Sequence, residues 1–291
     1  MLKSENIGSF FRLHQQQELN SSALYEKIAY TTKNEKERQT LLSISREEYT
    51  HATVFEKYSG CRLKPNRLWV NLHVFVQHIL GYTFMIKLLE RAEDKDIGSY
   101  RAEIGRIPEL TQVLEEEEMH EKKLTDILDE ERLHYAGDMV LGMNDALVEL
   151  TGALAGYTFA MQNTEIIAMA GLITGVSATL SMAASGYLSS RENDAKNAVK
   201  SSVYTGFAYL ITVALLIVPY LLSPVDAYFT ALAATLLIAV SIIAAFNYYL
   251  SVAKGRSFRK SFFVMAGISL SVAAISFVVG LVVKNVLGID L

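Results

Sequence analysis

The charged residues of this 291-residue chain are concentrated in its first half. Residues 1–138 hold 19 of the 27 Lys and Arg residues and 24 of the 31 Asp and Glu residues. Residues 139–291 instead contain apolar stretches, each near the ~20 residues that cross a bilayer, at positions 139–161, 166–188, 203–222, 228–250 and 262–283. This division excludes a single water-soluble globule. We predict an all-α protein with a soluble domain over residues 1–136 and a five-span membrane domain over residues 137–291.

Composition excludes several classes of function. The net charge of −4 argues against a nucleic-acid partner, because such binding relies on attraction between basic residues and phosphate. The single cysteine, Cys61, excludes a disulfide framework and any zinc or iron–sulfur site built from four thiolates. The first residues lack the apolar segment of a cleavable signal peptide, so none is expected.

The links between the apolar stretches differ in charge. Those after the first and third stretches contain no Lys or Arg. Those after the second and fourth contain Arg191, Lys196 and Lys200, and Lys254, Arg256, Arg259 and Lys260. Basic links stay in the cytoplasm. We therefore predict a multi-pass protein of the cell membrane, with a cytoplasmic N-terminal domain and the C-terminus outside.

Two carboxylates, Asp145 and Glu149, lie well inside the first apolar stretch and share one helix face. Ionisable groups inside a membrane are costly and typically mark an ion pathway. A divalent cation, or a proton exchanged against it, suits paired carboxylates. The alternative is that both are simply solvated near the cytoplasmic end. A thioether at Met182 would favour a transition metal, unless Met182 only fills the core.

Small residues predict close helix packing in the same region. Gly152 and Gly156, and again Gly171 and Gly175, have the four-residue spacing that lets helix backbones approach each other in lipid.

Residues 141–148, Leu-Gly-Met-Asn-Asp-Ala-Leu-Val, resemble the first span of the vacuolar iron transporter family, and residues 181–189, Ser-Met-Ala-Ala-Ser-Gly-Tyr-Leu-Ser, resemble its second span. The resemblance implies a dimeric carrier with five spans that moves Fe²⁺ or Mn²⁺ out of the cytoplasm in exchange for protons. It makes Asp145 and Met182 metal ligands. Two features depart from the family. Gly186 stands where the family has glutamate. The short link of residues 189–200 replaces the metal-binding helices that the family inserts between its second and third spans.

Residues 5–133 have apolar residues at alternating three- and four-residue steps, which predicts four long helices closing as a bundle. The inward stripe of the third helix is expected to run without a break from Val76 and Ile79 to Tyr100. The aromatic stretch 68–80, with His73 and His78, is interpreted as part of that helix; the other interpretation places it at the membrane interface. The fourth helix is expected to continue through residues 129–137 into the first span.

Carboxylate and imidazole side chains interrupt these stripes at mid-helix. Two helices carry Glu-x-x-His pairs and the other two carry single glutamates on the inward stripe, namely Glu48 with His51, Glu117 with His120, Glu18 and Glu90. Buried carboxylates need compensating positive charge, and helical bundles use this set of ligands for two metal ions. The alternative is a solvated seam of charges. The run 115–118 is all glutamate, and only Glu117 combines the stripe with a histidine three residues later.

This constellation resembles the ferritin-like, rubrerythrin-type di-iron domains. The resemblance implies an iron site, with manganese as an option, held by Glu18, Glu48, His51, Glu90, Glu117 and His120. It adds Glu93 as an extra ligand and Tyr25 as a hydrogen-bond donor behind the ligands. His14, one turn from Glu18, is expected to be a packed or hydrogen-bonded residue. The four-cysteine rubredoxin module of that family is missing, which argues against a built-in electron donor.

Together, the two halves resemble the membrane-bound ferritin type. We expect a homodimer in membrane lipid that exports Fe²⁺ or Mn²⁺ and that captures, senses or oxidises metal at its cytoplasmic site. Whether it is an enzyme stays open, with ferroxidase activity as the option. The alternative function is a membrane-anchored di-iron oxidase or peroxidase with no transport role.

Overall fold

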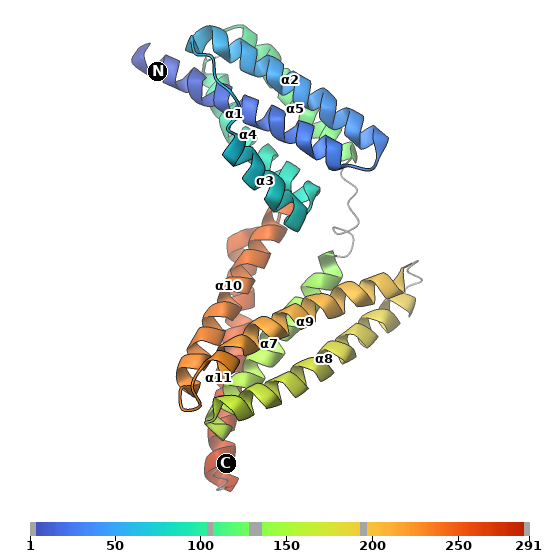
Figure 1. Cartoon of the computed structure of the whole chain (residues 1–291), viewed down its shortest axis with the longest axis vertical. Coiled ribbons are helices and arrows are strands. Elements are labelled where there is room, and N and C mark those ends of the chain that lie inside the picture. Colours follow the sequence, from blue (N-terminus) through green and yellow to red (C-terminus); the bar gives the residue numbers. More distant parts are fainter. Residues whose placement is uncertain (1–3, 104–106, 128–135, 193–196, 288–291) are drawn as a thin grey trace. The chain divides into compact units, whose positions relative to one another are not determined.

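The computed structural model describes residues 4–103, 107–127, 136–192 and 197–287 (Figure 1). These residues are helical apart from short links, and none of them lies in a strand, so the predicted all-α class is confirmed. The chain divides into two compact units, Met1–Glu130 and Glu131–Leu291. The predicted continuation of the fourth helix through residues 129–137 falls mostly outside the described residues.

The N-terminal unit contains α1 (Ser4–Thr31), α2 (Glu35–Ser59), α3 (Arg67–Leu80), α4 (Tyr82–Glu103) and α5 (Glu109–Ile127). Local sequence sets several of these boundaries. The side chain of Asn34 accepts a hydrogen bond from the backbone of Lys36 and caps the start of α2, and Gly60 with φ +64° caps its end. The side chain of Asn66 likewise caps α3 by accepting from the amides of Leu68 and Trp69.

The expected third helix is in fact two helices, and the prediction of an unbroken stripe is wrong. Gly81 has φ +92° and ψ 157°, a conformation that glycine adopts easily and other residues avoid, and it separates α3 from α4. Ile79 consequently lies 58% exposed on α3, and Val76 is only partly buried. The inward stripe begins after Gly81, on α4. The bundle is therefore built by α1, α2, α4 and α5.

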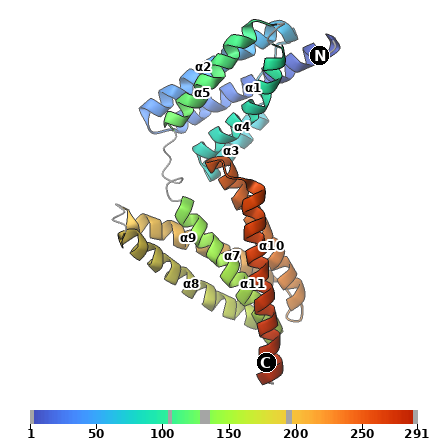
Figure 2. The ribbon, with the colours of Figure 1, turned by 180° about the vertical axis from the view of Figure 1, so that it is seen from behind.

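The interior of this unit has three layers along the helix axes. One apolar cluster includes Tyr25, Ile44, Met85 and Leu124, and the other includes Phe11, Phe55, Tyr100 and Leu110. On each helix, the carboxylates and histidines of the predicted metal site lie in sequence between these two apolar clusters. Figure 2 shows α5 running beside α2, the two helices that contribute a Glu-x-x-His pair each.

The C-terminal unit contains α7 (Ala136–Met161), α8 (Thr164–Glu192), α9 (Ala198–Leu222), α10 (Tyr228–Lys254) and α11 (Phe258–Leu287). Each of the five predicted apolar stretches is thus helical. Four described helices, α8 to α11, are long and apolar enough to cross a membrane. Helix α7, which carries Asn144, Asp145 and Glu149, is not among them, and a fifth span stays a prediction.

Helix α7 packs against all four of the other helices, and glycines lie at several of the close contacts between helices of this unit. A Cβ atom at Gly280 of α11 would collide with the carbonyl oxygen of Gly156. A Cβ atom at Gly175 of α8 would collide with Val213 of α9. The glycine pairs predicted from the sequence are therefore contact points between helices.

Candidate metal centre and membrane groove

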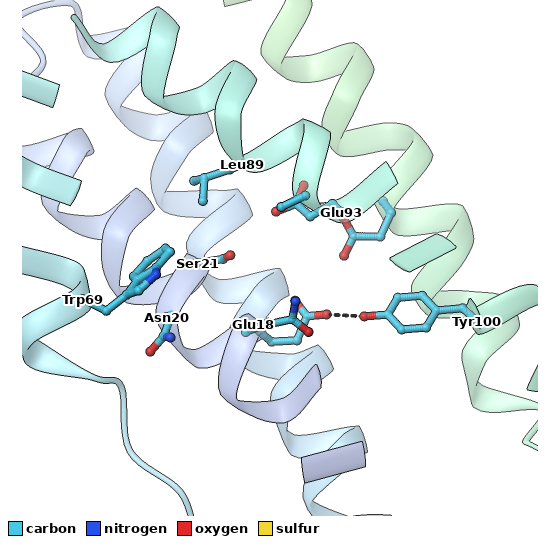
Figure 3. A pocket seen from close by; sticks show the side chains of 10 residues that line it. Glu18, Asn20, Ser21, Trp69, Leu89, Glu93 and Tyr100 are labelled. Atoms are coloured by element: carbon cyan, nitrogen blue, oxygen red, sulfur yellow. Dashed lines mark hydrogen bonds between the residues drawn. The ribbon is translucent and has the colours of Figure 1, made fainter. Parts of the chain in front are cut away.

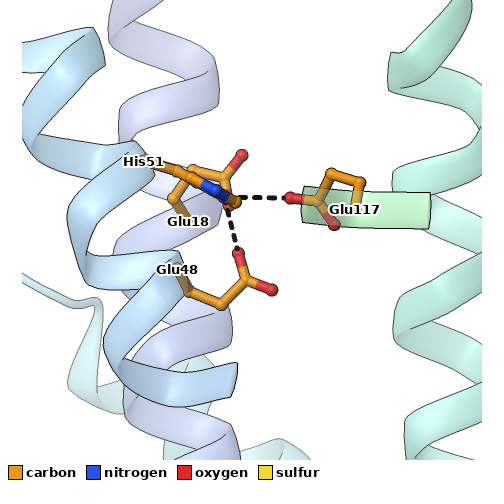
Figure 4. A group of neighbouring side chains, drawn as sticks. All are labelled: Glu18, Glu48, His51 and Glu117. Atoms are coloured by element: carbon orange, nitrogen blue, oxygen red, sulfur yellow. Dashed lines mark ion pairs between the residues drawn. The ribbon is translucent and has the colours of Figure 1, made fainter. Parts of the chain in front are cut away.

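Four side chains that the sequence predicts as metal ligands converge inside the N-terminal bundle (Figure 4). They are Glu18 from α1, Glu48 and His51 from α2, and Glu117 from α5. One potential ligand atom from each lies within 4.8 Å of the others, and all four residues are buried. His120 of α5 completes the group, because it contacts both Glu48 and Glu117.

Glu48 and Glu117 are shared between the two imidazoles. The Nδ1 atom of His51 lies 3.1 Å from Glu117 Oε1 and 3.7 Å from Glu48 Oε2. The Nδ1 atom of His120 lies 3.3 Å from Glu48 Oε1 and 3.5 Å from Glu117 Oε2. Each carboxylate therefore faces both histidines with one oxygen toward each.

The outer nitrogens of the two imidazoles are held by residues that were not predicted from the sequence. His51 Nε2 donates to Glu116 at 2.7 Å, and His120 Nε2 donates to Glu47 at 2.5 Å. A carboxylate behind a ligating histidine fixes the ring and keeps the proton on the outer nitrogen, so that Nδ1 can bind metal. Glu47 and Glu116 could have been found from the sequence, because each of them directly precedes the glutamate of a Glu-x-x-His pair.

The pKa values of the cluster indicate a deficit of positive charge. Burial lowers the pKa of His51, but the close carboxylates of Glu117 and Glu48 outweigh it and raise the value to about 10. The same balance raises the pKa of His120 to about 11. Burial and the charge of Glu48 raise the pKa values of Glu18 and Glu93 well above those of ordinary carboxyl groups. Protons thus supply the charge that a bound cation would otherwise supply.

The unpaired atoms of the cluster test whether a metal fits. Both carboxylate oxygens of Glu48 and the Nδ1 atoms of His51 and His120 are buried, and none has a hydrogen-bond partner within the described part of the chain. Such atoms are costly to bury unless something else binds them. Carboxylate and imidazole donors suit divalent iron or manganese. The residues present therefore fit a metal centre.

Helix α4 contributes two carboxylates that differ in their surroundings. Glu90 is buried, and its Oε2 atom accepts a hydrogen bond from Lys87 at 2.6 Å. Glu93 is partly exposed as a residue, but its Oε1 atom is buried with no hydrogen-bond partner among the described residues. The charges of Glu48 and Glu117 act on Glu93. Glu93 is thus within electrostatic reach of Glu48 and Glu117, and Glu90 acts on Glu93 in turn.

Two tyrosines lie behind the cluster, and only one makes the predicted kind of contact. Tyr25 is fully buried, but its hydroxyl has no hydrogen-bond partner in the described chain. Tyr100 of α4 instead donates to Glu18 Oε1 at 3.1 Å and lies 3.3 Å from Nδ1 of His14. Tyr100 therefore fills the role expected of Tyr25, and His14 is hydrogen-bonded as expected.

A pocket of about 260 Å³ opens beside the cluster (Figure 3). Glu18, Glu93 and Glu117 line it together with Tyr100. The rest of its wall combines apolar residues with polar ones, namely Trp69, Leu89, Ala92, Gln17, Asn20 and Ser21. The pocket gives small molecules or ions a space next to three of the predicted ligands.

The three predicted residues of the transport path lie in one groove of the membrane unit. Asp145 and Glu149 of α7 face Met182 of α8 across this groove. The rest of its lining also comes from α8, with hydroxyl groups at Thr174, Ser177, Ser181 and Ser185 and apolar side chains at Ile173 and Ala178. Glu149 is exposed, and its Oε2 atom accepts a hydrogen bond from Tyr209 of α9 at 3.2 Å. The neighbouring Asn144 lines a different pocket, with Asn247 and Met265.

Residues 136–195 match the model of the VIT family, the vacuolar iron transporters. The match spans α7 and α8 and therefore includes Asp145, Glu149 and Met182. It confirms the predicted resemblance over this segment and indicates membrane transport of a metal ion. No curated protein sequence matched the chain. The rubrerythrin-type resemblance of the N-terminal unit stays a prediction.

Proposed function

We propose that this protein transports Fe²⁺ or Mn²⁺ across the cell membrane and out of the cytoplasm through the groove between α7 and α8. The observation that supports this most directly is the meeting of Asp145, Glu149 and Met182 in one groove, within the segment similar to the VIT family. In this proposal the N-terminal cluster captures, senses or oxidises the metal before export.

The chemistry of the groove supports a divalent transition metal as the substrate. Two carboxylates can neutralise the charge of a divalent cation, and hydroxyl oxygens from α8 can replace part of its hydration shell. The thioether of Met182 adds a softer ligand, which disfavours magnesium and calcium. The Tyr209 hydroxyl orients Glu149. Because binding a cation displaces protons from carboxyl groups, exchange against protons is a natural driving force.

The exposure of the groove supports a homodimer. Glu149 is exposed, and the groove is open along one side. A carboxylate that faced hydrocarbon would be strongly destabilised. A second copy of the chain that covers this side would remove the two carboxylates from lipid and close the path.

We further propose that α7 is the fifth span and that the N-terminal unit is cytoplasmic. The links α8–α9 and α10–α11 and the helix ends beside them carry Lys and Arg residues, whereas the links α7–α8 and α9–α10 carry none. With five spans, the positive-inside rule places the C-terminus outside. The polar residues of α7 are then those of the path itself.

In the N-terminal unit we propose a site for two metal ions. Glu18, Glu48, His51, Glu117 and His120 would hold the ions, together with the α4 carboxylates Glu90 and Glu93. When bound, two iron ions would supply one-electron chemistry toward oxygen or peroxide. Tyr100 holds Glu18 in place, and Glu47 and Glu116 hold the two imidazoles.

The pocket beside this cluster supports a second candidate function, that of a membrane-anchored di-iron oxidase or peroxidase. Three of the proposed ligands line that pocket, so oxygen or hydrogen peroxide would reach the metal there. This candidate predicts turnover of the oxidant by the purified protein and no movement of metal across the membrane.

Flux into vesicles distinguishes the two candidates. The full chain is reconstituted in liposomes, and entry of Mn²⁺, or of Fe²⁺ under anaerobic conditions, is followed with a trapped metal-sensitive dye. We expect wild-type flux, its loss in Asp145→Asn, and unchanged flux in the control Glu165→Gln, because Glu165 is exposed on α8 and does not line the groove. Equal flux in wild type and Asp145→Asn would refute the proposed path. Oxidant turnover without any flux would favour the oxidase.

A further inference from the structure

Helix α3 has apolar side chains on two sides. On its inner side Val70 is buried, and Trp69 and Val74 pack against the apolar cluster that contains Tyr25. On its other side four large apolar residues are exposed, namely Leu68 at 80%, Leu72 at 56%, Phe75 at 63% and Ile79 at 58%. We call these four residues the outer face of α3.

The spacing of the outer face is that of a single helical stripe. Its members follow one another at steps of four, three and four residues, which places them on one side of the helix. A helix that is apolar on both sides is normally covered on both sides, and a compact apolar stripe at the surface indicates an interaction site. Trp69 and Val74 of α3 pack against the apolar cluster that contains Tyr25, whereas the four residues of the outer face remain largely exposed.

The charge around α3 indicates what covers it. Residues 57–89 contain five Lys or Arg residues and no Asp or Glu, although residues 1–138 as a whole are acidic. Arg62, Lys64 and Arg67 are exposed just before α3 or in its first turn, and Arg62 lies 3.6 Å from Glu56. Two copies that paired through this face would bring two basic surfaces together, which disfavours a second copy as the occupant.

We propose that the outer face of α3 docks on the surface of a lipid bilayer that contains anionic lipids. A helix with an apolar stripe and basic residues lies in the interface, with its apolar side among the acyl chains and its basic groups at the headgroups. The same chain carries four helices able to cross a membrane, and these helices would keep the N-terminal unit tethered close to a bilayer. The proposal does not depend on the transport function.

Spin labels on the full chain test this proposal. Cys61→Ser removes the only cysteine, and single cysteines are then introduced at Leu72 or Ile79 of the outer face. Leu13 of α1 is the matched control, because it is also a large apolar residue and is 59% exposed. The labelled proteins are reconstituted in vesicles of phosphatidylcholine with phosphatidylglycerol, and collisions of each label with oxygen and with a water-soluble nickel chelate are measured.

Docking predicts that labels at positions 72 and 79 collide more with oxygen than with the nickel chelate, and that the label at position 13 shows the reverse. In vesicles of phosphatidylcholine alone, access of the nickel chelate to positions 72 and 79 should rise several-fold. The proposal is overturned if these positions resemble position 13, because the face is then in water. It is also overturned if both reagents are excluded, because protein then covers the face.

Discussion

The two acidic sites of this chain hold their carboxylates in opposite ways. In the N-terminal unit, Glu48 is fully buried between two apolar layers, and two histidines face it. In the membrane unit, Asp145 and Glu149 line an open groove whose described lining contains hydroxyl groups and a thioether but no histidine. A closed site rich in ligands retains its ions, whereas an open site with few ligands lets an ion enter and leave.

The two acidic sites also differ in how the absence of metal affects the stability of the fold. Buried carboxylates without a cation must take up protons or pair with protonated histidines, which ties the stability of the N-terminal unit to metal. The groove carboxylates are only partly buried, so we expect the membrane unit to fold without metal. The four predictions below test this contrast, beginning with the largest expected effect.

Replacing Glu48 should remove metal from the N-terminal site without affecting transport through the groove. We expect Glu48→Gln to reduce bound iron or manganese from about two ions to less than one per chain. The reason is that Glu48 faces both Nδ1 atoms and both of its oxygens are unpaired. Metal content of the purified full chain measures this, and Glu56→Gln on the same helix is the control. Normal metal content in Glu48→Gln would contradict the proposed site.

Removing metal should make the N-terminal unit less stable as pH rises. The pKa values of His51 and His120 are raised to about 10 and about 11, so their contribution to stability is complete below pH 6.5 and is lost as pH rises toward those values. The raised pKa values of Glu18 and Glu93 act in the same direction. For each proton that the folded state holds and the unfolded state does not, the free energy of unfolding falls by about 1.4 kcal/mol per unit rise in pH.

Fluorescence of Trp69 measures this effect in the full chain treated with a chelator. Trp69 is the only tryptophan, and it packs against the apolar core of the N-terminal unit, so it reports the unfolding of that unit. The unfolding temperature should fall between about pH 6.5 and 9, and added Mn²⁺ should restore it more at higher pH, because metal displaces protons. A flat pH profile would mean that the cluster does not hold these protons.

The two carboxylates of α4 should differ in their effect on metal binding. We expect Glu93→Gln to weaken binding of one ion about 10-fold or more, and Glu90→Gln to weaken it only a few-fold. Glu93 lines the pocket with Glu18 and Glu117, whereas Glu90 is hydrogen-bonded to Lys87. Competitive titration against a chelator of known affinity measures both. The reverse order would make Glu90 the ligand and Glu93 the additional residue, as the family resemblance implies.

The smallest expected effect concerns the groove. Tyr209→Phe removes the hydroxyl that donates to Glu149. A hydrogen bond of about 1 kcal/mol corresponds to a change of about 5-fold in transport rate. Tyr220→Phe is the control on the same helix, because Tyr220 is also fully buried but its hydroxyl contacts Thr158 at 2.6 Å. Equal rates in the two variants would show that Tyr209 does not position Glu149.

Periodicity predicted the helices and the inward positions of the metal-binding side chains, because both follow from 3.6 residues per turn. It did not predict the break at Gly81, because the stripe passes in phase from Ile79 to Thr83, and a glycine within a helical pattern is often tolerated. The positive φ of Gly81 is a property of the folded chain that cannot be read from the pattern of apolar residues. The exposure of the outer face of α3 follows from this break.

Contacts between helices were harder to predict than positions on one helix. Glu47 and Glu116 lie beside the inward stripes, and their roles arise only when α2 and α5 meet. Tyr100 was placed on the correct stripe, but its bond to Glu18 joins residues 82 positions apart. In the groove, the i and i+4 spacing placed Asp145 and Glu149 together, and the family resemblance supplied Met182.

The hydrogen bonds behind the two histidines cross from one half of the bundle to the other. Glu116 of α5 holds His51 of α2, and Glu47 of α2 holds His120 of α5. Neither half can orient its own imidazole. During synthesis, α1 and α2 are completed first and carry Glu18, Glu48 and His51. At that stage Tyr100 and Glu116, which hydrogen-bond to Glu18 and His51, have not yet been synthesised. We therefore expect a ribosome-bound N-terminal fragment to bind metal only weakly before α5 has joined it.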